Sequence, residues 1–136
     1  MGTYLSTPVT DKCEESGESL ECPDVPCSWA VVDMQGWRKS MEDAHVAVTD
    51  IALPGEAEAK SDAKVFGVFD GHGGPEVARF CGLYLVSVLT QQPTWTTGVP
   101  LEPPSEGDDA NNSQVGLALR SAFHALDRMI DDESRR

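Results

Sequence analysis

Residues 64–76 read K-V-F-G-V-F-D-G-H-G-G-P-E and form the most informative segment of the chain. The segment opens as a run of apolar, mostly β-favouring residues, which is typical of a strand buried on both faces. An aspartate, a histidine and glycines follow at once, and Pro75 suits the first turn of a helix. The pattern places a carboxylate and an imidazole where a strand ends. Glycines at that turn allow a ligand or metal to approach the main chain closely.

Further strands and helices are predicted on both sides of this segment. Residues 29–35, ended by Gly36, and residues 45–51 each have the composition of a short strand. No helical pattern separates these strands from the strand at 65–69, which favours antiparallel pairing. One helix is predicted from Pro75 to about residue 91, and a second from about residue 114. Strands followed by two helices predict an α+β fold.

Apolar residues recur with helical spacing in both predicted helices. The first helix is expected to bury Val77, Phe80, Cys81, Tyr84, Leu85 and Val88. The second is expected to bury Leu119, Ala122, Phe123, Leu126 and Ile130. His124 is expected at the surface or at its boundary.

Two stretches lack such a pattern. Residues 1–27 are acidic and rich in Pro, Ser, Glu and Gly, so we expect an extended or mobile arm there. Residues 91–113 form a long polar insertion that we expect to be flexible. Residues 28–136 carry most of the apolar density and are assigned to the globular part.

The formal net charge of −13 argues against nucleic-acid binding and against a polybasic membrane footprint. No apolar run is long enough to span a membrane, and no secretory signal is visible, so we expect the cytoplasm or nucleus. The four cysteines lack the spacing of a zinc site, and free thiols are expected.

The N-terminal sequence M-G-T-Y-L-S matches the pattern for N-myristoylation, with Gly2 as the acceptor. The alternative is an ordinary tail that begins Met-Gly. One myristoyl chain gives only marginal membrane binding. If Gly2 is myristoylated, we expect only weak association with membranes.

Two acidic clusters carry the candidate chemistry, one at Glu42 and Asp43 and the other at Asp70. Carboxylates are hard ligands suited to Mg²⁺ or Mn²⁺. Glycine at position 71 allows its carbonyl oxygen to be a further ligand. Two such ions about 3.5–4 Å apart lower the pKa of a bridging water and clamp a phosphoryl group.

Each cluster has a cationic or titratable neighbour. Arg38 offers a planar fork for phosphate oxygens. His72 titrates near neutral pH and can donate a proton to a leaving oxygen. These residues predict a divalent-metal site suited to phosphate chemistry.

Simpler interpretations exist for each of these residues. Asp70-Gly71 is also typical of a tight hairpin turn. The alternative for His72 is an ordinary loop residue that faces solvent. Glu42 and Asp43 are open to interpretation as surface charges paired with Arg38.

The two clusters also resemble the signatures of a known family. Residues 38–45, R-K-S-M-E-D-A-H, resemble the R-x-x-M-E-D-A-H signature of the metal-dependent type 2C protein serine/threonine phosphatases, the PPM family. Residues 69–74, F-D-G-H-G-G, resemble its second signature. The resemblance implies a sandwich of two antiparallel sheets with helices outside (α-β-β-α) and the metals between the sheets.

The resemblance also implies roles for individual residues. Asp70 would bridge two Mg or Mn ions, and Glu42 and the Gly71 carbonyl would bind one of them. Asp43 would hold water in the second shell. Arg38 would bind substrate phosphate, and His72 would protonate the departing oxygen. The implied substrates are phosphoserine and phosphothreonine proteins.

The chain departs from the family pattern in one respect. The family's domain is longer, and its later part supplies further aspartates in D-G-x-W-D and D-N motifs, which do not occur in these 136 residues. We therefore expect residues 28–136 to be the N-terminal portion of a PPM-type domain, by truncation, gene-model error or splicing. The alternative function is a truncated, non-catalytic product that acts, if at all, as a metal- or partner-binding module.

Overall fold

The computed structural model describes residues 4–19, 26–55, 62–97 and 113–134. Within those ranges the strands come first: β1 (Tyr4–Ser19), β2 (Cys27–Arg38), β3 (Ala44–Ala52) and β4 (Asp62–Phe69). The helices follow: α1 (Glu76–Thr90), α2 (Pro93–Thr96) and α3 (Gln114–Ser134). This order confirms the predicted α+β class.

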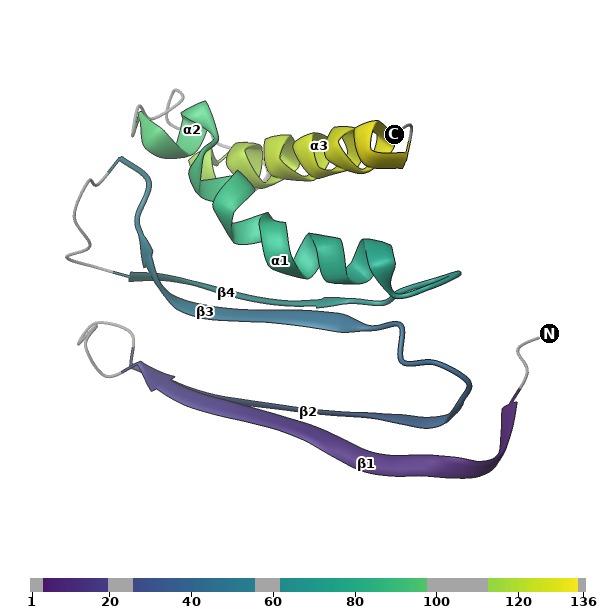
Figure 1. The fold of residues 1–136 in the computed structure, drawn as a ribbon. Coiled ribbons are helices and arrows are strands. Elements are labelled where there is room, and N and C mark those ends of the chain that lie inside the picture. The colour runs from purple at the N-terminus through teal and green to yellow at the C-terminus, as the bar shows by residue number, and fades with distance from the viewer. Residues whose placement is uncertain (1–3, 20–25, 56–61, 98–112, 135–136) are drawn as a thin grey trace.

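The strands form two separate antiparallel sheets, β1–β2 and β3–β4 (Figure 1). The β3–β4 sheet lies between the β1–β2 sheet and the helices, with α1 next to it and α3 beyond α1. Two β layers with helices outside one of them are consistent with the predicted partial sandwich. In the described residues the helices cover one side of the pair of sheets.

Residues 4–19, within the stretch predicted to be an extended or mobile arm, form the strand β1. This strand pairs with β2, placing Glu15 opposite Val31 and Cys13 opposite Asp33. Its backbone N–H and C=O groups find partners on β2 whatever its side chains are, so composition alone does not reveal the strand. The register is irregular between Tyr4 and Val9, a stretch that contains Pro8, which has no N–H to donate. Gly2 and residues 20–25 lie outside the described residues.

The three predicted strands are present, but β2 pairs with β1 and not with β3. The antiparallel pairing predicted for the other two is confirmed: Ala44 lies opposite Phe69, and Val48 opposite Val65. The strand predicted at residues 29–35, which is β2, runs past its predicted end to Arg38. Gly36 lies within β2 with a φ of 66°, where the register with β1 is irregular.

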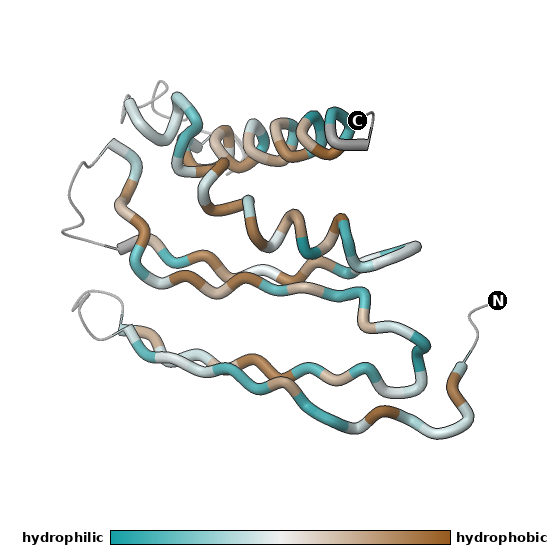
Figure 2. The backbone as a smooth tube through the Cα atoms, in the orientation of Figure 1, coloured by the Kyte–Doolittle hydropathy of each residue, from teal (hydrophilic) through white to brown (hydrophobic). Residues whose placement is uncertain are grey.

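The core lies between α1, α3 and the β3–β4 sheet, where hydrophobic segments face one another (Figure 2). Leu89 of α1 and Leu126 of α3 are its largest fully buried side chains. The whole buried cluster comprises Val46, Ile51, Leu85, Leu89, Trp95, Ala118, Ala122 and Leu126.

The predicted buried faces of both long helices are confirmed at Leu85, Ala122 and Leu126, but not at every position. Val77 and Tyr84 are exposed on α1, and Phe123 is 52% exposed on α3. α1 packs against the sheet along Gly82, where an added Cβ would lie 3.2 Å from the carbonyl oxygen of His45. The buried residues of α1 are the predicted Leu85 together with Ala78 and Leu89, which were not predicted.

Within the insertion at 91–113 that was predicted to be flexible, residues 93–96 form the short helix α2. Trp95 is buried there, and its Nε1–H donates a hydrogen bond to the carbonyl oxygen of Ala52 at 3.1 Å. A buried aromatic residue with a satisfied polar group therefore anchors this turn to the end of β3. Residues 98–112 lie outside the described residues. No helix in the described ranges is both long and apolar enough to cross a membrane.

Candidate functional site

The loop between β4 and α1 carries Asp70 and Gly71. Asp70 follows the last residue of β4 directly, and the chain reaches α1 through Pro75, which caps the helix. Gly73 and Gly74 have φ of 80° and 135°, values that residues with a side chain rarely adopt. Because this loop joins a strand to a helix, the interpretation of Asp70-Gly71 as a hairpin turn is wrong.

The link between β2 and β3 carries Glu42 and lies directly against this loop. A Cβ built on Gly71 would overlap the carbonyl oxygen of Glu42 and would lie 2.7 Å from its carbonyl carbon. Only a residue without a side chain fits at position 71. The two acidic clusters, which are far apart in the sequence, are thus brought into backbone contact.

The side chain of Glu42 is fixed by hydrogen bonds to both of its oxygens. The hydroxyl of Ser40 donates to Oε1 at 2.6 Å, and the backbone N–H of Gly74 donates to Oε2 at 3.2 Å. The Ser40 hydroxyl is the main cause that lowers the pKa of Glu42, followed by the Gly74 N–H, with smaller help from the Gly73 N–H and the charge of Arg38. Desolvation opposes this effect, less than the Ser40 and Gly74 hydrogen bonds lower the pKa but more than Gly73 or Arg38 does. Glu42 is therefore an anion at neutral pH.

One cavity of about 340 Å³ collects the predicted residues from both clusters. It is lined by Met34, Gln35, Arg38, Ser40, Met41, Glu42, Asp43, Asp70 and Gly71. Five of the six predicted site residues are in that set. The sixth, His72, is exposed on the same loop and is not among the described residues that line the cavity.

Arg38 is exposed at this cavity. Among the residues that the structure describes, no ion pair of 4.0 Å or less involves it. The interpretation of Arg38 as the ion-pair partner of Glu42 and Asp43 is therefore wrong for this arrangement. Its guanidinium group can take an anionic ligand instead.

The donor atoms suit a hard cation, although the set is small. Glu42, Asp43 and Asp70 all offer carboxylate oxygens to one cavity, which is the ligand type of Mg²⁺ and Mn²⁺. Within the described ranges, however, no group of three or more His, Cys, Asp or Glu side chains is arranged to hold a metal ion. These residues fit one part of a divalent-metal site.

Some residues of the site were not predicted. Ser40 lies two residues before Glu42 in the polar link, so a search for local hydrogen-bond donors would have found it. Met34 and Gln35 line the cavity because β2 extends to Arg38, which its sequence pattern did not predict.

Residues 28–135 match the model of a family described as Protein phosphatase 2C. The chain is 37% identical over 130 residues to "Probable protein phosphatase 2C 58" of Oryza sativa subsp. japonica, covering 96% of this chain and 28% of that protein. It is 35% identical over 133 residues to "Protein phosphatase 1G" of Homo sapiens, covering 98% of this chain and 20% of that protein. It is also 35% identical over 133 residues to "Probable protein phosphatase 2C 60" of Arabidopsis thaliana, covering 98% of this chain and 29% of that protein. The chain therefore spans less than a third of each relative.

Proposed function

The chain belongs to the protein phosphatase 2C family, and from that membership we propose that it forms part of a metal-dependent phosphatase acting on phosphoserine and phosphothreonine in proteins. One observation carries the proposal. Arg38, Glu42, Asp43, Asp70 and Gly71 come from two distant segments and line a single cavity. An anion-binding group and several hard oxygen donors thus share one space, as phosphoryl transfer requires.

The residues of the cavity divide into phosphate-binding and cation-holding groups. Arg38 binds two oxygens of the substrate phosphate through its planar fork. Asp70, Glu42 and the Gly71 carbonyl would hold Mg or Mn, and Asp43 orients water beside them. When bound, two such ions supply a water of low pKa and neutralise the charge of the phosphoryl group.

His72 is the proposed proton donor to the departing serine or threonine oxygen. Its ring is exposed and lies outside the cavity lining. An exposed side chain on a glycine-rich loop can turn about its torsions toward a bound substrate. Hydrogen bonds of this kind often tighten only once the substrate is present.

A non-catalytic metal- or partner-binding module is the second candidate function. It is favoured by the small number of donors, since no group of three or more suitable side chains is arranged to hold a metal in the described residues. We propose that aspartates in segments that the relatives have and that these 136 residues lack complete the site. The isolated chain is then inactive or nearly so.

A chimera separates these candidates. These 136 residues replace the matching segment of the rice relative, and phosphate release from a phosphoserine peptide is measured with Mn²⁺. The chimera is expected to be active, and Asp70→Asn to lower its rate by about 100-fold or more. Asp127→Asn is the matched control, because it removes the same charge from an exposed position on α3.

Two results would contradict the phosphatase proposal. One is a folded chimera without activity, with folding checked by circular dichroism. The other is an Asp70→Asn chimera that keeps the full rate. Hydrolysis by the isolated chain at about 1 s⁻¹ or faster, a rate typical of enzymes, would instead eliminate the non-catalytic candidate.

A further inference from the structure

The walls of the site cavity come from two different sheets. Met34, Gln35 and Arg38 belong to β2, whereas Asp43 precedes β3 and Asp70 follows β4. Within the described residues, no main-chain ladder joins the β1–β2 sheet to the β3–β4 sheet. The distance between the Arg38 wall and the Asp43 wall therefore depends on side-chain contacts between the sheets and on the short link at 39–43.

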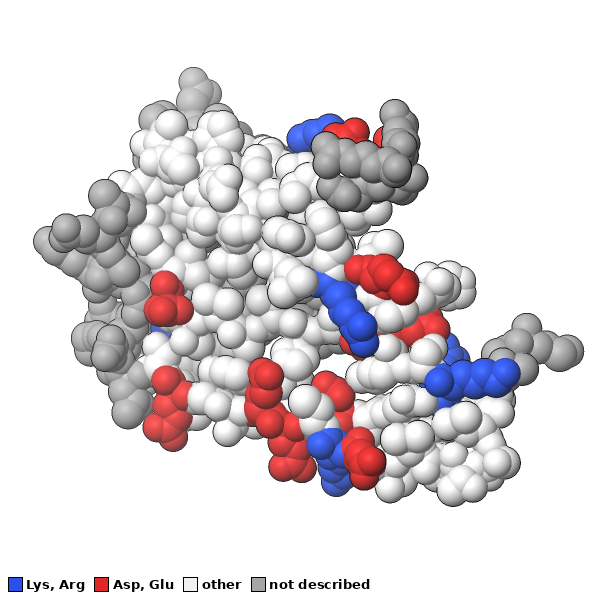
Figure 3. All heavy atoms as spheres, viewed as in Figure 1, with Lys and Arg blue, Asp and Glu red and all other residues white. Residues whose placement is uncertain are grey.

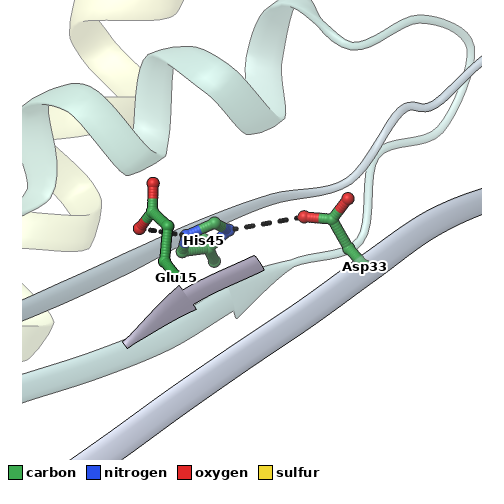
Figure 4. Close-up of polar contacts among 3 residues, drawn as sticks. All are labelled: Glu15, Asp33 and His45. Carbon is green, nitrogen blue, oxygen red and sulfur yellow. Dashed lines mark hydrogen bonds and ion pairs between the residues drawn. The ribbon is translucent and has the colours of Figure 1, made fainter. Parts of the chain in front are cut away.

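His45 of β3 makes such contacts with both strands of the other sheet (Figure 4). Its Nε2 lies 3.2 Å from Oε2 of Glu15 on β1, and its Nδ1 lies 3.9 Å from Oδ2 of Asp33 on β2. A carboxylate can only accept, so the Nε2–H of His45 donates the hydrogen bond to Glu15. Within the described part of the chain, these are the polar side-chain contacts that join the two sheets.

Packing does not hold the imidazole ring in place on every side. A second cavity, of about 560 Å³, adjoins His45 and is also lined by Glu15, Asp33, Asp43 and Arg79. Figure 3 shows acidic side chains, with basic ones among them, over the strands. Because open space lies beside the ring, its orientation depends on the polar contacts, and the shorter of these is to Glu15.

We propose that Glu15 is a positioning residue of the site. Through His45 it holds the first residues of β3, and with them Asp43, against the sheet that carries Arg38. Glu15 precedes residues 28–135, so this role falls outside the segment that matches the family model. That the cavity binds metal and phosphate rests on the proposed function, whereas the positioning of Asp43 by Glu15 does not.

Three variants of the 136-residue chain test the proposal by amide NMR without metal or substrate. Glu15→Ala removes the contact. Glu14→Ala is the control, because it removes the same charge from the preceding residue of β1, which is exposed. Glu15→Gln keeps an oxygen that accepts from His45.

Glu15→Ala is expected to shift the amide signals of Arg38 and Asp43 and to speed hydrogen exchange at the start of β3. The increase should be about two- to fivefold, as for the loss of a contact at a partly exposed site. Glu14→Ala and Glu15→Gln should leave both readouts close to those of the unsubstituted chain. A merely destabilising change would instead speed exchange throughout the core.

Two results would overturn the proposal. The first is equal effects of Glu15→Ala and Glu14→Ala on Arg38 and Asp43. The second is measured on the unsubstituted chain and needs no variant to fold: an imidazole ¹⁵N spectrum in which Nε2 of His45 carries no hydrogen. Neither result depends on phosphatase activity, so failure of the positioning role and failure of the proposed function remain distinguishable.

Discussion

Substitution of Gly71 by alanine tests the contact that brings the two acidic clusters together. The added Cβ would lie 2.7 Å from the carbonyl carbon of Glu42 and 3.0 Å from its Cβ. Favourable separations between carbon atoms are about 3.5–4.0 Å, so one backbone must move by roughly 1 Å. Overpacking of this kind costs about 1–3 kcal/mol in the free energy of unfolding. For a chain of this size that lowers Tm by roughly 3–15 °C.

Thermal unfolding followed by circular dichroism measures the loss, and amide NMR shows where the structure moves. The signals of Glu42 and Asp43 should shift in Gly71→Ala. Gly73→Ala is the control on the same loop, since a Cβ there meets nothing within 4 Å although its φ of 80° is strained. It should lower Tm through strain and shift the signals of Glu42 and Asp43 less than Gly71→Ala does. An unchanged Tm and unshifted Glu42 signals in Gly71→Ala would refute the contact.

Three further predictions concern the core, Glu42 and the α2 turn. Leu89→Ala should lower the free energy of unfolding by about 2–5 kcal/mol, because Leu89 is fully buried, whereas Leu83→Ala on the exposed side of α1 should change it by about 0.5 kcal/mol or less in urea titrations. Ser40→Ala should raise the pKa of Glu42 toward 4.5, as measured by NMR titration of its carboxyl carbon. Because the pKa of Glu42 is lowered in the folded state, its ionised form stabilises the fold above pH 4.5 and this contribution is lost as pH falls through the folded pKa, so variant and unsubstituted chain should converge in stability in acid. Trp95→Phe should cost about 1–3 kcal/mol in the same urea titrations, because it leaves a carbonyl group without its indole donor, and an unchanged midpoint would argue against that hydrogen bond.

The parts of the fold that the sequence predicted depend on local chemistry. The apolar run at 65–69, the glycines after it and Pro75 specify a strand, a turn and a helix start through the conformations those residues favour. Glu42 and Asp70 were predicted to share a site because carboxylates are ligands for Mg²⁺ and Mn²⁺ and because both lie in segments that resemble the family's signatures. The structure places both beside one cavity.

The parts that were not predicted depend on contacts between distant segments. β1 is held by main-chain pairing with β2, to which its polar side chains give little clue. Phe123 has the right spacing for the buried face of α3, yet it is exposed, because the packing of α1 against α3 decides which face is covered. Glu15 belongs to the stretch interpreted as a mobile arm, so its contact with His45 could not be inferred from the sequence.

Titration of the 136-residue chain with Mn²⁺, followed by NMR, tests most directly whether the two acidic clusters form one cation site. Paramagnetic broadening should appear first at Glu42, Asp70 and Gly71, and Asp70→Asn should shift its onset to higher Mn²⁺ concentration. Broadening that begins at another acidic cluster, or that is unchanged in Asp70→Asn, would contradict a shared metal site in the cavity lined by Arg38, Glu42 and Asp70.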